Sequence, residues 1–207
     1  MDTQIRSERR TRKATALYEV ALDAFAELGF REAGVEEIAR RAGIANGTIY
    51  VYAASKRDLY RLVVEYGLGQ WQDAAAAAAL AVGSGPRLAR TRFEALCRAA
   101  FCYLESEPRL RRILARDPSL FPAATGTAHG EDPFGAVNRR SVEMLRRAIL
   151  DGMESGEFHV DDPTAAAELL FSLYRVLIES AYVQDNGDER RRFEAGLSII
   201  LDGISKR

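Results

Sequence analysis

Helical spacing of apolar residues is the feature that most constrains what this chain can fold into. Apolar side chains recur at intervals of three and four, and no segment shows the strict alternation typical of a half-buried strand. Residues 11–28 are representative, and Gly29 after them is suited to the left-handed conformation that ends many helices. The apolar positions of this first helix are Leu17, Val20, Ala21, Phe25 and Leu28.

Caps and helix breakers divide the rest of the chain into further helices. Ser55 and Asp58 fit a capping box, and Asp162 followed by Pro163 fits an N-cap with proline at the first helical position. Residues 118–131 form the longest break and are expected to be a disordered or ligand-gating loop. The sequence therefore predicts an all-α fold of nine helices without a sheet. After the first helix, these cover about 35–41, 45–52, 55–82, 86–105, 108–116, 132–155, 162–184 and 188–204.

Composition indicates a protein that does not enter a membrane. Of the 207 residues, 47% are apolar and 29% are charged, yet no apolar run approaches the about 20 residues that span a bilayer. The first residues are polar and lack the apolar core of a signal peptide, so we expect a cytoplasmic location. The net charge of −1 gives no overall attraction to nucleic acid. The cations near the N-terminus fit either a solvated end or a DNA-binding arm: Arg6, Arg9, Arg10, Arg12 and Lys13.

The scarcity of cysteine and histidine argues against metal and catalytic chemistry. Cys97 and Cys102 are five residues apart, which directs them about 140° from one another on a helix. We expect both to be buried thiols in a reducing compartment. The chain contains two histidines, His129 and His159, and no pattern of paired carboxylates. We therefore expect no metal site, no cofactor and no enzymatic activity.

Two short helices joined by a glycine-containing turn follow the first helix, which is the arrangement of a helix-turn-helix. The second of them, residues 45–52, is the one whose N-terminal part would meet base edges in the major groove. Asn46 can pair bidentately with adenine, and Gly47 permits close approach of the backbone to DNA. Thr48 and Tyr50 offer hydroxyls to phosphate oxygens. Each residue also has a structural alternative, since Thr48 could cap the helix and Tyr50 could be a half-buried core ring.

Lys56 is the charged member of this group. It begins the helix predicted at 55–82, where free amides and the helix dipole already favour an anion. The alternative is a solvated charge without a partner. Taken together at this spacing, the hydroxyls, the amide and the lysine favour DNA binding.

The stretch from Leu17 to Leu59 resembles the DNA-binding domain of the tetracycline-repressor (TetR) family. The family's pattern at the end of its first helix is matched by Phe25, Gly29 and Phe30. Its Ile-Ala-x-x-Ala-Gly-Val pattern is matched by Ile38, Ala39, Ala42, Gly43 and Ile44. Its Gly-Thr-Leu-Tyr pattern is matched by Gly47, Thr48, Ile49 and Tyr50. Its Ser-Lys-x-x-Leu pattern is matched by Ser55, Lys56 and Leu59. Gly34 and Ala45 stand where the family often has hydroxyl residues that cap helices.

The resemblance implies a DNA-binding domain at 1–54, a connecting helix at 55–82, and a ligand-binding and dimerisation domain at 83–207. It also implies a cytoplasmic homodimer that binds a palindromic double-stranded DNA operator, acts as a repressor and responds to a small-molecule effector. Thr48, Tyr50 and Lys56 would then contact phosphates, with Asn46 and Gly47 at the base edges and Tyr52 as a further groove contact. Two alternatives stay open, an all-helical enzyme and a helical dimer without DNA function.

The C-terminal helices have apolar faces wider than a narrow core-facing stripe. These faces are either buried within one chain or, as the resemblance implies, form a dimer interface. The interface candidates are Leu169, Leu173, Val176, Leu177, Phe193, Leu197, Ile200 and Leu201. Apolar residues of the middle helices are either core or the lining of an effector pocket. The pocket candidates are Phe93, Cys97, Phe101, Phe121, Phe134, Met144, Phe171 and Tyr174.

Overall fold

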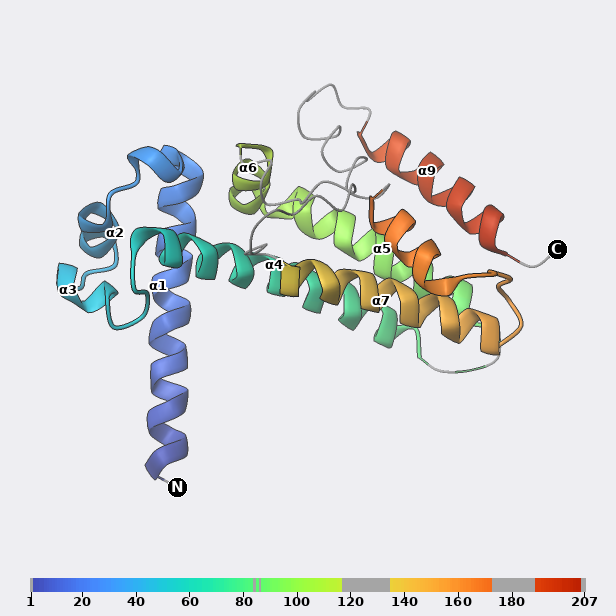
Figure 1. Cartoon of the computed structure of the whole chain (residues 1–207), viewed down its shortest axis with the longest axis horizontal. Helices are drawn as coiled ribbons and strands as arrows, with labels where there is room; N and C mark the ends of the chain where they lie inside the picture. Colours follow the sequence, from blue (N-terminus) through green and yellow to red (C-terminus); the bar gives the residue numbers. More distant parts are fainter. Residues whose placement is uncertain (1, 84, 86, 117–134, 173–188, 206–207) are drawn as a thin grey trace. The chain divides into compact units, whose positions relative to one another are not determined.

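The computed structural model describes residues 2–83, 85, 87–116, 135–172 and 189–205 (Figure 1). These residues form helices and no β-strand, which confirms the all-α prediction; one isolated bridge pairs Phe158 with Ser205. Residues 163–172 are also helical. None of the described helices has the length and apolar character needed to cross a membrane. The named helices are α1 (Asp2–Glu32), α2 (Val35–Arg41), α3 (Asn46–Ile49), α4 (Lys56–Ala81), α5 (Ala89–Ser106), α6 (Pro108–Arg116), α7 (Gly135–Glu154) and α9 (Glu189–Ile204).

The chain divides into two compact units, whose boundary falls inside α4. The head comprises Met1–Leu68 with Pro108–Arg116, and the body comprises Gly69–Glu107 with Asp117–Arg207. The head is larger than the 1–54 domain expected from the sequence, because it includes the first half of α4 and all of α6. Arg116 of α6 donates to the carbonyl of Ala26 in α1 at 3.0 Å.

The core of the head is built around the inner face of α1. Phe25 is 1% exposed and makes an edge-to-face contact with Tyr60 of α4, with ring centroids 5.1 Å apart. Ile38 of α2 and Ile49 of α3 are also buried, so each short helix is held by an apolar side chain. This packing explains how helices of seven and four residues persist, since isolated helices of that length are marginal in water.

Helix α1 begins at Asp2, well before the start expected at residue 11. Residues 7–13 of its first turns are exposed and polar, so they lack the apolar stripe that the sequence criterion requires. They contain neither glycine nor proline, and a helix propagates easily once it has formed. Gly29 interrupts α1 with φ 78°, as expected, although the chain resumes a helical turn up to Glu32.

Other helix ends show which local signals were informative. The bounds of α2 and α6 coincide with the predicted 35–41 and 108–116. Helix α3 is shorter than the predicted 45–52, and α5 begins at Ala89 rather than 86. Arg87 explains the later start, because its φ of 63° is incompatible with a right-handed helix.

Two predicted N-caps are present in the structure. Ser55 Oγ accepts a hydrogen bond from the amide of Asp58 at 3.1 Å, but the Asp58 carboxylate accepts from Ala54, one residue earlier than the capping box predicts. Asp162 Oδ1 accepts from the amides of Thr164 and Ala165, at 2.9 and 3.0 Å. The cap at Asp162 is therefore confirmed.

The body has its own core, formed by α5, α7, α9 and residues 158–170. Phe101 of α5 stacks on Phe193 of α9 with ring centroids 4.3 Å apart. Cys97 is buried, and burial raises the pKa of its thiol to about 12. The prediction for Cys102 was wrong, because this thiol is exposed on the other side of α5.

The predicted dimer-interface residues divide into three groups. Phe193, Leu197 and Leu201 are 2–3% exposed within the single chain, so they have no surface left for a partner and their assignment was wrong. Their spacing marked the buried side of α9. Leu169 is 60% exposed, whereas Ile200 packs against the body core. Leu173, Val176 and Leu177 lie outside the described residues, as do residues 118–131.

Candidate nucleic-acid interface and internal pocket

The helix-turn-helix segment exposes the N-terminal part of α3. Gly43 has φ 65°, a conformation that side chains rarely adopt, and it makes the tight turn between α2 and α3. Ile49 is 1% exposed and fixes α3 to the head core. Asn46 and Gly47 are therefore exposed at the start of α3. Tyr50 is 54% exposed, which excludes the core-ring alternative within the single chain.

The other residues of this segment are less exposed. Thr48 and Tyr52 are half-buried. No side chain caps α2 or α3, whose N-cap positions are Gly34 and Ala45. This agrees with the departures from the family pattern noted in the sequence, and it leaves the first amides of α3 without a side-chain acceptor.

Lys56 is held in place rather than freely solvated. Its Nζ donates to the carbonyl of Arg31 at 2.8 Å and lies 5.1 Å from the centroid of the Phe30 ring. The lysine therefore binds a carbonyl at the C-terminal end of α1, where the helix dipole favours a cation. An ammonium group has three donors, so this contact leaves capacity for a phosphate. No sequence signal indicated the Arg31 contact, because it joins residues 25 positions apart.

Glu37, one of the two acidic side chains at the start of α2, is neutralised within the head. Glu37 accepts hydrogen bonds from Arg40 and Arg41, and Arg41 also donates to Glu27 of α1 at 2.6 Å. The hydrogen bonds from Arg40, and then those from Arg41, lower the pKa of Glu37 to about 2. The carboxylate thus stays ionised, and its charge is matched by two guanidinium groups.

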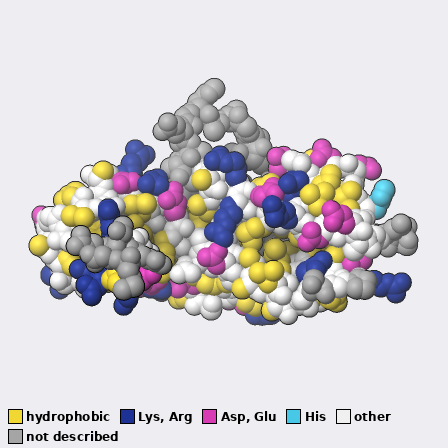
Figure 2. Space-filling view, turned by 90° about the horizontal axis from the view of Figure 1, so that it is seen from below, with side chains coloured by type: hydrophobic (Ala, Val, Ile, Leu, Met, Phe, Trp, Pro, Cys, Tyr) yellow, Lys and Arg dark blue, Asp and Glu magenta, His cyan; other side chains and the backbone are white. Residues whose placement is uncertain are grey.

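A group of basic side chains lies on the N-terminal turns of α1. Arg9, Arg10, Arg12 and Lys13 are exposed, and helical spacing places them within one half of the helix circumference. None of the four forms an ion pair with another described residue. Figure 2, which views the chain from this end of α1, shows Lys and Arg side chains around it. We call these four residues the α1 basic face.

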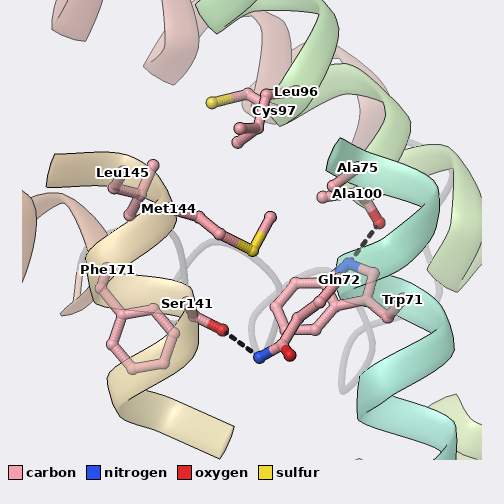
Figure 3. Close-up of a pocket in the computed structure, with 10 residues that line it drawn as sticks. All are labelled: Trp71, Gln72, Ala75, Leu96, Cys97, Ala100, Ser141, Met144, Leu145 and Phe171. Atoms are coloured by element: carbon pink, nitrogen blue, oxygen red, sulfur yellow. Dashed lines mark hydrogen bonds between the residues drawn. The ribbon is translucent and has the colours of Figure 1, made fainter. Parts of the chain in front are cut away.

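The body contains a pocket between α4, α5, α7 and residue 171. Its empty volume is about 380 Å³ when space open to solvent is included, and the side chains around it are largely apolar (Figure 3). Trp71 Nε1 donates to the carbonyl of Ala100 at 2.8 Å, which fixes the indole against α5. The lining residues are Trp71, Gln72, Ala75, Leu96, Cys97, Ala100, Ser141, Met144, Leu145 and Phe171.

Three of the predicted pocket residues, Cys97, Met144 and Phe171, line this pocket. Phe93 and Phe101 are each 1% exposed and belong to the body core, and Phe93 also lines a second pocket of the body together with Cys97 and Leu145. Phe121, Phe134 and Tyr174 lie outside the described residues. The sequence reasoning missed Trp71, Gln72 and Ser141. Trp71 and Ala75 are one helical turn apart, a spacing that could have indicated a lining face had the connecting helix been considered.

Comparison with known proteins identifies the head. Residues 17–63 match the family model described as "Bacterial regulatory proteins, tetR family". The match identifies residues 17–63 as a DNA-binding domain of the type that this family model describes. Over 59 residues it is 34% identical to the fatty acid metabolism regulator protein of Bacillus subtilis, a match that covers 28% of this chain and 30% of that regulator's length.

Longer matches extend the similarity into the body. The chain is 25% identical over 164 residues to the uncharacterized HTH-type transcriptional regulator YhgD of Bacillus subtilis, covering 78% of this chain and 80% of that protein. The fold of this chain is similar to that of the regulator FadR from Bacillus subtilis in complex with stearoyl-CoA. The TM-score is 0.75 at 20% identity, with 92% of this chain and 98% of that chain covered.

Proposed function

We propose that this protein is a TetR-family regulator, a dimeric transcriptional repressor that binds a palindromic operator and is released from it by a small-molecule effector. The observation that carries the proposal is the start of α3, where Asn46 and Gly47 are exposed while Ile49 anchors the helix. This end of α3 can therefore enter a major groove of DNA while the head stays folded. The family match over residues 17–63 supports the same interpretation.

The contacts within this interface follow from residue chemistry. Asn46 would read a base edge, with Gly47 beside it, and Thr48 and Tyr50 would bind phosphate oxygens. Tyr52 would add a groove contact. Lys56 would bind a phosphate with the donors that Arg31 does not use. The α1 basic face adds cations that form no ion pair with a described acidic residue, which would strengthen binding to any DNA sequence.

An effector would bind the body and act through α4. This helix contributes Trp71, Gln72 and Ala75 to the pocket, and its first residue, Lys56, contacts the end of α1 in the head. FadR, a protein of similar fold, was solved with stearoyl-CoA, which supports an effector with a large apolar part. Such a ligand shifts the protein away from DNA only if it binds the released conformation more tightly.

The first test measures binding of the purified protein to DNA selected from a random pool, over a range of salt concentrations. Lys56→Ala should weaken binding to every sequence and reduce the slope of log K against log salt by about 1. Arg139→Ala, an exposed cation of the body, is the control and should leave the slope unchanged. Circular dichroism checks that the Lys56 variant retains its helices. Absence of any specific complex at low salt would contradict the regulator proposal.

The second test asks whether Asn46 reads a base. Asn46→Ala should relax preference at one position of each half-site, with a loss of about 1–3 kcal/mol at the preferred base. Selection of DNA by the wild-type and variant proteins in parallel measures this preference. If binding weakened equally on all DNA sequences, Asn46 would instead be assigned to a contact with the DNA backbone.

A further inference from the structure

Two polar side chains meet at one part of the otherwise apolar pocket. Gln72 of α4 is 3% exposed, and its Nε2 donates to Ser141 Oγ and to the carbonyl of Val137, both at 2.8 Å. Gln72 and Ser141 both line the pocket, and Figure 3 shows their side chains meeting there. Because a carbonyl oxygen accepts but cannot donate, the contact with Val137 requires the nitrogen of the amide at that position. The amide is therefore fixed against α7 in one orientation before any ligand binds.

The amide oxygen of Gln72, Oε1, is an acceptor that the chain leaves unused. Both hydrogen bonds of the side chain involve Nε2, and no described residue donates to Oε1. This oxygen is not sealed off, because the described buried side-chain atom that lacks both a partner and a neighbouring space is Asn138 Nδ2. Polar groups inside native proteins are normally paired with the protein or with an ordered molecule. A donor that enters the pocket would satisfy Oε1.

Ser141 offers the complementary group beside it. A hydroxyl has one hydrogen to donate and can also accept. Ser141 Oγ accepts from Gln72, and its hydrogen has no acceptor among the described residues. Because Oε1 and Nε2 belong to the same amide, the unused acceptor lies next to the atom that Ser141 binds. This part of the pocket therefore presents one acceptor and one donor side by side.

A hydroxyl group matches both with a single oxygen atom. Its hydrogen can be donated to Oε1 while its oxygen accepts from Ser141. An ether oxygen accepts but cannot donate, so it would leave Oε1 unpaired. A carboxylate would face Oε1 with a second acceptor. It would also lose its hydration without a counter-charge, since none of the described lining residues is charged.

Resting on the effector site proposed above, we propose that the pocket binds an apolar molecule through one hydroxyl group, which donates to Gln72 Oε1 and accepts from Ser141 Oγ. The apolar part of the molecule lies against Trp71, Ala75, Leu96, Met144 and Phe171. Gln72 is thus a specificity-determining residue, since it distinguishes an alcohol from an ether of the same composition.

Trp71 allows a direct test, because it is the chain's single tryptophan and it lines the pocket. Its fluorescence is followed during titration of the full-length protein at neutral pH with hexan-1-ol, with the isomeric ether 1-methoxypentane and with hexanoate. We expect hexan-1-ol to bind about tenfold more tightly than either of the others, the amount that one hydrogen bond of ordinary strength provides. The isomers contain the same atoms, so their difference reports the donated hydrogen.

Three results of this titration would each overturn the proposal. The first is the absence of a saturable change with the alcohol. The second is equal affinity for the two isomers, which is expected if a water molecule keeps its place between Gln72 and Ser141. The third is tighter binding of hexanoate than of hexan-1-ol.

Variants assign the preference to a residue. Gln72→Met keeps the length of the side chain and removes the amide, so it should lower the affinity for hexan-1-ol about tenfold and abolish the preference. Ser141→Ala should weaken both isomers and keep the preference, because each loses the same donor. Gln70→Met, the same substitution at an exposed position of α4, is the control and should change neither affinity. A preference for the alcohol that persists in Gln72→Met would contradict the assignment.

Release of DNA is measured separately, so the two proposals can fail independently. If hexan-1-ol binds with the expected preference but leaves the DNA complex intact, the effector mechanism is wrong and the pocket chemistry is supported. Specific DNA binding without a preference for the alcohol gives the opposite result. The comparison of isomers in the wild-type protein needs no variant, so it decides the question even if Gln72→Met does not fold.

Discussion

Glu37 illustrates how single side chains prepare the head for a polyanion. A carboxylate near the recognition helix would repel phosphate, but its contacts with Arg40 and Arg41 match its charge locally. Arg41 also reaches Glu27 of α1, at 2.6 Å, so the same group of charges joins α1 to α2. Surface ion pairs of this kind contribute little singly, and their value here is in orientation and charge compensation.

The lowered pKa of Glu37 predicts a specific pH dependence of stability. Because its hydrogen bonds to arginine favour the ionised form, the carboxylate stabilises the folded head above its ordinary pKa of 4.5. This contribution is lost as the pH falls toward about 2. Glu37→Gln should therefore lower the thermal midpoint at neutral pH, and the difference from wild type should disappear near pH 2. Thermal melts across this range provide the measurement.

Glu36 offers the matched control for that experiment. It is the adjacent, exposed glutamate, and it forms no ion pair with a described residue. Glu36→Gln should leave the melting curve close to wild type at every pH. A Glu37→Gln midpoint that follows wild type over the whole range would show that the arginine contacts do not stabilise the head.

Residue chemistry selected candidates at the exposed start of α3, but it did not reveal the contacts within the chain. Asn46 and Gly47 were recognisable as candidates because their chemistry and their place at a helix start are local properties. The contact of Lys56 with Arg31 was not recognisable, since it depends on two segments meeting in space. The buried Nδ2 of Asn138, which has no hydrogen-bond partner among the described residues, could not be recognised for the same reason, because only packing decides whether an asparagine finds a hydrogen-bond partner.

Helix α4 contains two glycines whose effects differ according to what faces them. A Cβ on Gly67 would lie 2.9 Å from Leu110 Cδ1 of α6, and Leu110 is fully buried, whereas a Cβ on Gly69 would meet nothing within 4 Å. Gly69→Ala should therefore stabilise the protein by about 0.5–1 kcal/mol, the usual gain from replacing a helical glycine. Gly67→Ala should destabilise it by about 1–3 kcal/mol through overpacking. Denaturant unfolding of the two variants measures both changes.

The pair is informative because helix propensity alone predicts the same gain at both positions. Stabilisation by Gly67→Ala equal to that by Gly69→Ala would mean that α6 does not pack closely on α4. The opposite signs expected here would show that Gly67 permits close approach of α6 within the head.

The bounds of helices whose ends are marked by proline or glycine were predicted well. The bounds of helices whose ends depend on packing or charge were not. Proline at 108 and the glycines around α2 mark ends that depend on backbone geometry, so α2 and α6 match their predicted bounds. The early turns of α1 and the late start of α5 depend on propagation and on the strained Arg87. Periodicity detects a buried face, so it overlooks a helix without one.

For the whole molecule, the decisive question is which apolar surface of the body remains for a second copy. Spacing located an apolar face on α9, but spacing does not say whether the same chain or another covers it. Phe193, Leu197 and Leu201 pack in the body core of the same chain. Leu169 and Ile199 are the large apolar side chains of residues 163–172 and α9 that stay exposed, at 60% and 74%. We propose that the dimer forms through these exposed positions.

Ile199→Glu tests this assembly, with Leu80→Glu as its control. Leu80 is 78% exposed on α4 and is as accessible as Ile199, so both substitutions add the same charge to a similarly solvated site. Burying a large aliphatic side chain contributes about 1.5–3 kcal/mol, and a charge in its place opposes burial. Ile199→Glu should therefore raise the dimer Kd at least about tenfold and weaken operator binding with it. Light scattering over a concentration series measures the dissociation. Dissociation by Leu80→Glu, or a stable Ile199→Glu dimer, would place the interface elsewhere on the body.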